Sequence, residues 1–242
     1  MRFDILTLFP EMFEPLKESI IGRAAKKGVL EINVIDIRDF TEDKHRKCDD
    51  TPFGGGAGMV MSAQPIAAAI NAVDPEHKAK RIYTSPRGET LKQKKVVSLA
   101  KEKRILILCG HYEGVDQRAI DLFIDEEISV GDYVLTGGET AAIVVIDAVA
   151  RLVPGVLPNE EAYTNESHTD GMLEAPQYTK PPVWHDRAVP EVLKNGNDAA
   201  IAEYNRIAAL VDTWKNRPDM LDKLNISESD WAKMLAFERG MC

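Results

Sequence analysis

The chain has 242 residues, 44% of them hydrophobic, and a formal net charge of -9 at pH 7. This is typical of one large or two modest globular domains, and the acidic balance excludes a protein that coats nucleic acid with its whole surface. Its three cysteines, Cys48, Cys109 and Cys242, are far apart and form no CxxC motif, which argues against a disulfide framework or a zinc site. The longest strongly apolar stretch, 141–146, is too short to span a membrane, so we expect a protein of the reducing cytoplasm with no membrane partner.

In chain order, apolar runs typical of buried strands alternate with segments of helical spacing. Strands are predicted at 3–9, 31–37, 81–85, 104–110 and 123–130. Helices are predicted over 11–27, 63–73, 89–102 and 141–153, and a further short helix is predicted to begin at Val115. A turn is predicted at 86–88, and a long polar, glycine-rich loop at 38–62, where loops of such length are usually functional. The alternation predicts an α/β fold with a parallel sheet.

The composition of the chain changes after Pro154. Residues 158–170 are polar and rich in turn-forming residues, and the residues from 175 onward have helical spacing over most of their length. We therefore predict a first domain at 1–157, a flexible linker at 158–170 and a small, mostly helical domain at 171–242.

Three of the predicted strands end in glycine-rich turns: YTSPRG at 83–88, CGHYEGVD at 109–116 and SVGDYVLTGGE at 129–139. In parallel α/β folds, ligands bind beyond the carboxyl ends of the strands, and glycine there lets the backbone approach a ligand closely. Neither GxxxxGK[ST] nor GxGxxG occurs, so a phosphate cradle is not indicated. A pocket of backbone groups and apolar walls suits a neutral, flat ring such as adenine. The alternative is that these glycines only make tight turns.

On these motifs the chain resembles the bacterial tRNA (guanine-N(1))-methyltransferases, which methylate the guanosine immediately 3′ of the anticodon. The resemblance is carried by FDILTLFPEMF, PFGGGAGMVM, YTSPRG, CGHYEGVD, SVGDYVLTGGE and RLVPGVL, and then by DGMLEAPQYTKP, VPEVLKNGN and TWKNRPDML. It implies the SPOUT fold, in which part of the α/β domain is threaded through a trefoil knot. It also implies S-adenosylmethionine as methyl donor, the anticodon stem-loop of tRNA as substrate, and a homodimer whose subunits together build each active site.

By position, the resemblance implies that the three glycine turns hold S-adenosylmethionine in a bent shape. The implied contacts are Tyr83, Thr84, Ser85, Pro86, Gly110, Glu113, Gly114, Val130, Gly131, Asp132, Tyr133, Val134, Leu135, Gly137 and Gly138. Substrate contacts are implied at Gly54, Gly55, Gly56, Met59, Tyr178, Lys180 and Arg206. A requirement for Mg²⁺ is implied too, although no motif marks its ligands. For Glu113 the alternative is a carboxylate at a helix N-terminus, where the helix dipole favours it.

Methyl transfer to N(1) of guanine needs a base that removes the N(1) proton and a cation that stabilises charge on the neighbouring carbonyl oxygen. The resemblance implies Arg151 as the cation; the alternative is a surface ion pair with Asp147, one helical turn earlier. It implies Glu166 as the base. The family's usual residue there is aspartate, so the longer side chain displaces the carboxylate by roughly 1 Å, and Asp170 is a rival base.

Further departures from the family pattern leave other functions open. His111 and Lys180 stand where arginine is common, and lysine keeps the charge of arginine but not its bidentate contact. The departure at Glu166 leaves open a catalytically inactive RNA-binding relative, which would transfer no methyl group to tRNA. A nucleotide-binding α/β oxidoreductase is a third hypothesis, and it predicts affinity for NAD rather than for S-adenosylmethionine.

Overall fold

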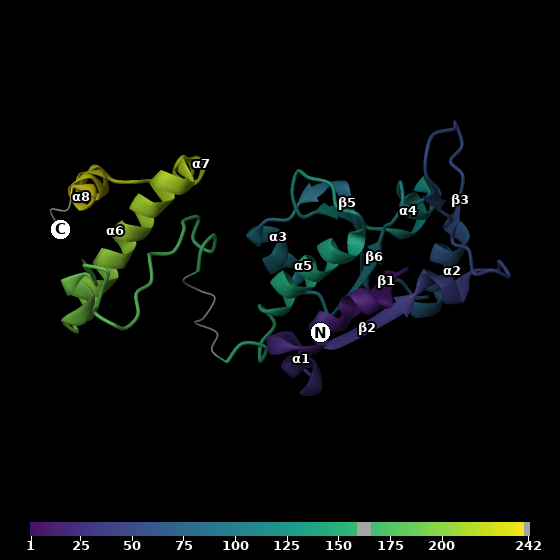
Figure 1. The fold of residues 1–242 in the computed structure, drawn as a ribbon, viewed down its shortest axis with the longest axis horizontal. Helices are drawn as coiled ribbons and strands as arrows, with labels where there is room; N and C mark the ends of the chain where they lie inside the picture. The colour runs from purple at the N-terminus through teal and green to yellow at the C-terminus, as the bar shows by residue number, and fades with distance from the viewer. Residues whose placement is uncertain (159–165, 240–242) are drawn as a thin grey trace. The chain divides into compact units, whose positions relative to one another are not determined.

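The computed structural model describes residues 1–158 and 166–239 (Figure 1). It divides into two compact units. The units are Met1–Asn159 and Glu160–Cys242. The linker predicted at 158–170 falls mostly outside the described residues. None of the helices in the described part of the chain has the length and apolarity that a membrane crossing requires.

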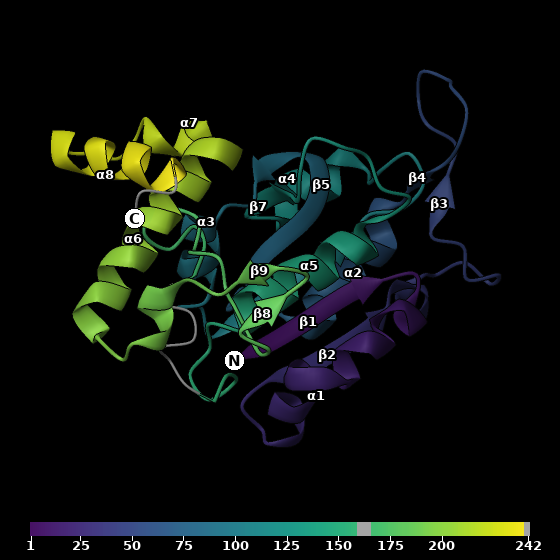
Figure 2. The ribbon, with the colours of Figure 1, turned by 60° about the vertical axis from the view of Figure 1, so that its left-hand side comes forward.

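The first unit is built on a five-stranded sheet in which every neighbouring pair is parallel. In spatial order the strands are β2 Glu31–Asp36, β1 Arg2–Thr7, β6 Arg104–Cys109, β5 Lys80–Thr90 and β7 Glu126–Ser129. Figure 2 shows β1 and β2 lying side by side. Each strand overlaps a predicted one, so the prediction of an α/β fold with a parallel sheet is confirmed.

Helices cover both faces of the sheet, which explains why its strands are apolar on both sides. One face packs against η1 Pro10–Lys17, α1 Ser19–Lys26, α3 Gln93–Leu99 and α5 Gly138–Ala150, and the other against η2 Ile37–Phe40, α2 Ala63–Val73 and α4 Gln117–Phe123. Along β6 the side chains alternate, with Ile105 and Ile107 in the first core and Leu106 and Leu108 in the second.

Two predicted helices are shorter than expected. The one over 11–27 is interrupted, because Pro15 lies inside the 3₁₀ helix η1 and Ser19, the first residue of α1, adopts a left-handed φ of 60°. The one over 89–102 begins only at Gln93, because β5 continues to Thr90. In both places the backbone geometry determines where the helix begins, and the spacing of apolar residues does not reveal that geometry.

The largest difference from the predicted elements lies in β5. β5 does not end at the turn predicted for 86–88. Thr84 and Glu89 both pair with Ile128 of β7, so the residues between them form a bulge and the strand continues after it. Gly88 permits this bulge, since a Cβ there would lie 2.4 Å from the backbone nitrogen of Ile128. The bulge holds the first glycine turn against the edge strand of the sheet.

The long loop predicted at 38–62 contains a small antiparallel hairpin. Its strands, β3 Asp49–Asp50 and β4 Val60–Met61, close a glycine-rich segment between them. Both views show the chain around β3 projecting away from the sheet (Figures 1 and 2). Met61 is fully buried and forms a parallel bridge with Val115, so the base of this projection is tied to the turn after β6.

The second unit combines helices with a short hairpin. Its elements are β8 Val183–Trp184, β9 Arg187–Ala188, η4 Glu191–Lys194, α6 Asp198–Asn216, α7 Pro218–Leu221 and α8 Glu228–Glu238. The core of the unit is formed by Ile207, Leu210, Val211, Leu221 and Met234. From 175 onward the described residues are helical over most of their length, as predicted, but the helices are concentrated after Asp198. Before it the described residues from 175 form only the short η4, because the prolines of that stretch cannot continue a helix.

A buried ion-pair network joins the amino-terminal ends of the strands, at the edge opposite the glycine turns. Asp4 on β1 and Asp74 at the end of α2 are both buried. Arg104 on β6 approaches both, with Nε 2.6 Å from Asp4 Oδ2 and Nη1 3.5 Å from Asp74 Oδ1. Arg81 on β5 donates from Nε to Asp74 Oδ2 at 2.9 Å. Two buried carboxyl groups thereby tie three strands to α2.

Replacing Asp74 by asparagine is expected to lower the free energy of unfolding at neutral pH by about 3–5 kcal/mol, because it leaves Arg81 as an uncompensated buried charge. Burial raises the pKa of Asp74, but hydrogen bonds from the Lys78 and Ala79 backbone and from Arg81 outweigh it, and the net pKa is lowered. Such a group stabilises the fold above its unfolded pKa of about 3.9 and ceases to do so as the pH falls through its folded pKa.

Urea unfolding of Asp74→Asn and the unchanged protein, from neutral pH down to about pH 3, measures this effect. The difference between the two proteins should shrink on the acid side. A difference of the same size at every pH would contradict the assignment. Glu76→Gln, at an exposed position two residues away, serves as the control and should leave stability nearly unchanged.

Candidate active site

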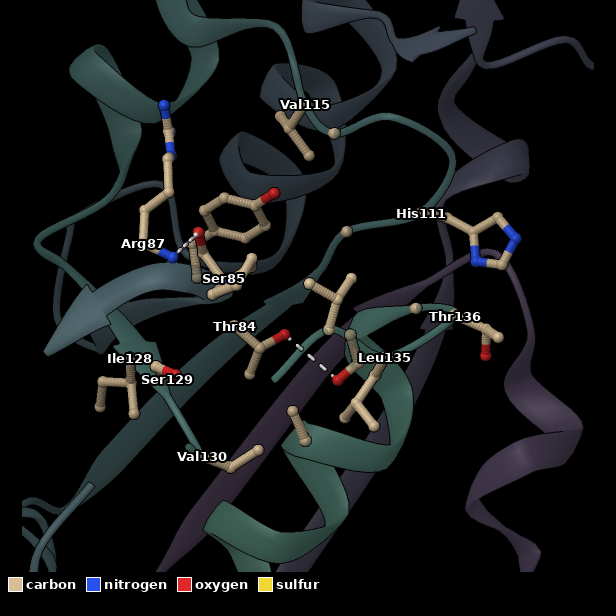
Figure 3. A pocket seen from close by; sticks show the side chains of 18 of the residues that line it. Thr84, Ser85, Arg87, His111, Val115, Ile128, Ser129, Val130, Leu135 and Thr136 are labelled. Atoms are coloured by element: carbon tan, nitrogen blue, oxygen red, sulfur yellow. Dashed lines mark hydrogen bonds between the residues drawn. The ribbon is translucent and has the colours of Figure 1, made fainter. Parts of the chain in front are cut away.

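The carboxyl ends of β5, β6 and β7 converge on a cavity of about 370 Å³ (Figure 3). This is the edge at which open parallel sheets bind ligands. All of the predicted cofactor contacts except Asp132 line the cavity. The structure therefore brings together three motifs that lie far apart in the sequence.

Asp132 is exposed and is not among the residues that line the cavity. The backbone N–H of Tyr133 donates to the carbonyl of Gly131 at 2.9 Å, which makes a sharp turn with Asp132 on its outer side. Gly131 has a φ of 156°, and a Cβ there would lie 2.4 Å from the Tyr133 ring. Asp132 therefore belongs to the third glycine motif without lining the cavity.

Gly138 is the point at which all three glycine turns touch. Its backbone N–H donates to the carbonyl of Gly110 at 2.7 Å, and its own carbonyl accepts from Thr84 Oγ1 at 3.2 Å (Figure 3). A Cβ on Gly138 would lie 2.4 Å from Thr84 Oγ1, 2.8 Å from Gly110 N and 3.0 Å from Cys109 Cα. Glycine is needed here because the backbone segments approach so closely.

A buried carboxyl group, that of Glu139, lies directly after this glycine pair. Thr7 Oγ1 at the end of β1 donates to Glu139 Oε1 at 2.8 Å, and His111 Nδ1 lies 3.9 Å from Glu139 Oε2. The His111 ring contacts two aromatic rings, those of Phe9 at 4.7 Å and Tyr112 at 4.9 Å between centroids. These contacts connect the end of β1 to two of the three glycine turns and so hold the shape of the cavity.

The cavity walls are mainly backbone and uncharged side chains. Burial raises the pKa of the Tyr83 phenol, which stays neutral while its ring packs against Gly110. Burial, assisted by nearby Glu139, raises the pKa of the Cys109 thiol well above its usual range, so this cysteine is not a reactive thiolate. Arg87 donates to Gln117 Oε1 at 3.1 Å. Such walls suit a flat, uncharged ring better than a phosphate.

Several residues that line the cavity were not predicted as contacts. They are Arg87, His111, Tyr112, Val115, Gln117, Ile128, Ser129, Thr136 and Ala141. Most of them belong to the three glycine motifs, so their position in a turn at the end of a strand could have identified them as cavity residues. Ile128 and Ala141 lie on a strand and a helix, where the sequence indicates burial but not which cavity a side chain faces.

Glu113 links the cavity to the glycine-rich loop. Its backbone N–H donates to the carbonyl of Met59 at 3.0 Å, and a Cβ on Gly58 would lie 2.5 Å from its carboxyl oxygen. The role of helix N-cap belongs to Asp116, whose carboxylate accepts from the Arg118 N–H at 3.0 Å. The alternative interpretation of Glu113 as the helix-terminal carboxylate is therefore wrong.

The predicted substrate contacts in the glycine loop do not line the cavity. Gly54, Gly55 and Gly56 are exposed, with φ of 88°, 76° and 125°, and a Cβ on any of them would meet nothing within 4 Å. Met59 is half-buried and contacts the cavity residue Glu113 through its carbonyl. These glycines are thus explained by backbone conformation rather than by crowding.

The three predicted catalytic residues belong to different units. Arg151 follows the last residue of α5 in the first unit and caps that helix. Glu166 is half-buried and Asp170 is exposed in the second unit. The segment that carries both carboxyl groups is tied to α6, because the N–H of Leu173 donates to Thr213 Oγ1 at 2.9 Å.

The remaining predicted substrate contacts lie in the second unit. Tyr178 and Lys180 are exposed and line a second cavity of about 630 Å³ beside the β8–β9 hairpin. Arg206 lies on α6, where its guanidinium pairs with Glu203 and Asp230. Hydrogen bonds lower the pKa of each of these carboxyl groups to about 2: Glu203 accepts from Arg206 and Lys233, and Asp230 accepts from Arg206 and Ser227.

Within residues 1–158 and 166–239, His, Cys, Asp and Glu side chains form no group of three or more able to hold a metal ion. The described residues therefore supply no all-protein cage for the Mg²⁺ that the resemblance implies. Because Mg²⁺ is commonly held by one or two carboxylates together with substrate phosphates, no chemical step is assigned to it.

Comparison with known proteins agrees with the resemblance found in the motifs. Residues 1–223 match the family model described as tRNA (Guanine-1)-methyltransferase TrmD. The chain is 52% identical over 230 residues to the tRNA (guanine-N(1)-)-methyltransferase of Clostridium botulinum strain 657, with 95% of each chain covered. It is also 52% identical over 230 residues to the protein of that name from Clostridium perfringens, covering 95% of this chain and 97% of the relative. The chain therefore belongs to the tRNA (guanine-1)-methyltransferase family.

Proposed function

We propose that this protein transfers the methyl group of S-adenosylmethionine to N(1) of the guanosine immediately 3′ of the anticodon in tRNA. The observation that carries the proposal is the cavity in which three glycine turns meet at Gly138, in a chain of this family. Its volume of about 370 Å³ lies within the range of small-molecule sites. When bound, S-adenosylmethionine supplies a methyl group activated by its sulfonium centre.

The donor set of the cavity supports S-adenosylmethionine over a dinucleotide. Ile128, Val130 and Leu135 offer apolar walls to an adenine ring. Gly110 and Gly138, whose backbones are in direct contact, present main-chain groups to the cavity because they have no side chains. That contact between distant turns also supports the trefoil knot that the resemblance implies. Glu113, the carboxyl group among the lining residues, suits the charged amino group at the methionine end.

The remaining chemistry concerns the N(1) proton of guanine. Glu166 is proposed as the base that removes it and Asp170 as the rival, while Arg151 stabilises the charge that develops on the guanine oxygen. An ordinary carboxylate, with a pKa of about 4, is a weak base for this proton. Covering it with bound tRNA removes water and raises the pKa of a carboxyl group, which strengthens the base.

The geometry of α5 supports a homodimer with shared active sites. Gly138 begins this helix at the cavity and Arg151 caps its other end, so at 1.5 Å per residue they lie roughly 20 Å apart. An arginine side chain is much shorter than that distance. An Arg151 acting at the cavity therefore has to come from a second copy of the chain. Val144, an exposed apolar residue on the mostly buried α5, suits such a contact.

The second unit supplies the surface proposed to bind tRNA. Tyr178 and Lys180 beside their shared cavity, and Arg206 on α6, are its proposed contacts. The domain predicted at 171–242 is accordingly assigned to the anticodon stem-loop, and the predicted domain at 1–157 to the methyl donor.

Incubation with S-adenosylmethionine carrying a labelled methyl group and an anticodon stem-loop RNA tests the function. We expect the label in N(1)-methylguanosine after nuclease digestion and mass analysis, and none when that guanosine is replaced by adenosine. Absence of transfer at saturating methyl donor would favour the inactive RNA-binding relative instead. Calorimetry with NAD and with S-adenosylmethionine separates the third hypothesis, because an oxidoreductase would bind only the former tightly.

A further inference from the structure

Phe53 is the most exposed large apolar side chain in the described part of the chain, at 101% relative exposure. It lies in the loop between β3 and β4, which is part of the projection visible in Figures 1 and 2. An exposed aromatic ring forgoes the favourable burial that most phenylalanines obtain in a folded protein. The ring is therefore available to a partner outside the chain.

The backbone after Phe53 keeps the ring accessible. Gly54, Gly55 and Gly56 all have left-handed φ values, and no atom lies within 4 Å of the position that a Cβ would take. The N–H of Gly55 donates to the carbonyl of Pro52 at 3.4 Å, which places Phe53 inside a turn. A run of glycines in open space permits the loop to adjust as a partner docks.

The base of this loop is fixed to the cavity. Met59 and Met61 form backbone hydrogen bonds to Glu113 and Gly114, at 3.0 and 2.9 Å, and both of those partners line the cavity. Phe53 precedes Met59 by six residues, so a fully extended chain would place it at most roughly 20 Å away. The ring therefore lies within reach of the surface around the cavity, at most roughly 20 Å from the residue that is hydrogen-bonded to Glu113.

The surroundings of Phe53 favour a single nucleobase over a protein surface or a phosphate. Its neighbours in the loop are polar or small, whereas a protein interface has a continuous apolar core. The preceding residues 41–50 contain three Lys or Arg and four Asp or Glu, so they offer no net attraction to the RNA backbone. An aromatic ring without a positive field recognises RNA by stacking on an unpaired base.

We infer that Phe53 stacks on an unpaired base of the tRNA anticodon loop and so helps to hold the target guanosine at the cavity. The inference rests on the proposed function, since it requires tRNA as the substrate. Phe53 acts on binding and position; it takes no part in proton removal or methyl transfer.

Two substitutions separate ring stacking from simple apolar contact. Phe53→Leu keeps an apolar side chain without the ring, and it should weaken binding of an anticodon stem-loop RNA by ~10-fold, within a range of ~5- to 100-fold. Phe53→Trp keeps an aromatic ring and should bind within ~2-fold of the unchanged protein. Because stacking releases no counterions, the salt dependence of binding should be the same in all three proteins.

A fluorescent base gives a direct readout of the contact. RNA carrying 2-aminopurine beside the target guanosine should change its fluorescence on binding the unchanged protein and Phe53→Trp, but much less on binding Phe53→Leu. Leu122→Ala, at an exposed position on α4 outside the cavity lining, is the matched control and should bind RNA normally. Thermal unfolding and affinity for S-adenosylmethionine should be unchanged in every variant.

The possible failures are distinguishable. If the unchanged protein methylates the RNA while Phe53→Leu binds it with full affinity, the inference is overturned and the proposed function stands. If the unchanged protein neither binds nor methylates the RNA, the proposed function fails, and the inference with it. If Phe53→Leu changes the sedimentation of the protein without RNA, the ring contacts a second copy of the chain and the inference is overturned.

Discussion

Replacing Gly138 by alanine is expected to reduce the affinity for S-adenosylmethionine by at least ~10-fold and to lower the melting temperature by several degrees. The added Cβ would lie 2.8 Å from Gly110 N and 3.0 Å from Cys109 Cα, and these backbone atoms belong to a buried strand end and cannot rotate away. Overpacking of this kind costs about 1–3 kcal/mol, and 1.4 kcal/mol corresponds to a factor of ten in affinity.

Isothermal calorimetry and thermal unfolding measure the two effects of Gly138→Ala. Thr140→Ala, an exposed position in the first turn of α5, is the control and should change neither. If the Gly138→Ala protein binds S-adenosylmethionine with unchanged affinity, the methyl donor lies elsewhere. That result would remove the main support for the proposed site.

Replacing Arg151 by alanine is expected to slow methyl transfer in single turnover by ~10²–10³-fold, because a cation opposite developing charge is lost. Affinity for S-adenosylmethionine should not change, since Arg151 is proposed to contact the guanine oxygen and not the methyl donor. Glu166→Gln should slow the same step by ~10²–10⁴-fold through loss of the base. Asp170→Asn should retain most of the rate if Glu166 is the base.

The same variants test which carboxyl group is the base and where Arg151 acts. Full rate in Glu166→Gln, with loss in Asp170→Asn, would move the base to Asp170. Glu174→Gln, at another exposed carboxyl group nearby, is the control. Mixing the impaired Arg151→Ala and Gly138→Ala proteins should restore partial activity, above that of either variant alone, because in a mixed dimer one site combines an intact cavity with an intact Arg151. No restoration would contradict active sites shared between subunits.

The order of elements in the first unit was readable from the sequence because it depends on local burial. The run from Ile105 to Cys109 is apolar at every position since helices cover both faces of β6, and that pattern requires no knowledge of the partners. The glycine turns were readable for a similar reason. Gly138 indicates a close approach between backbone segments, and Gly131 indicates a sharp turn. Neither indication requires knowing which segment the glycine contacts.

Tertiary structure alone decided which of these signals meet and which way each side chain faces. Thr7 and Glu139 are 132 residues apart, yet they form one buried hydrogen bond. The bulge in β5 depends on pairing with Ile128, and the exposed position of Asp132 depends on a turn closed by Tyr133. The exposure of Phe53 was equally hidden, because an aromatic residue in a sequence is first expected in a core. Short-range spacing reports whether a residue is buried, whereas its partners are set by chain segments that only folding brings together.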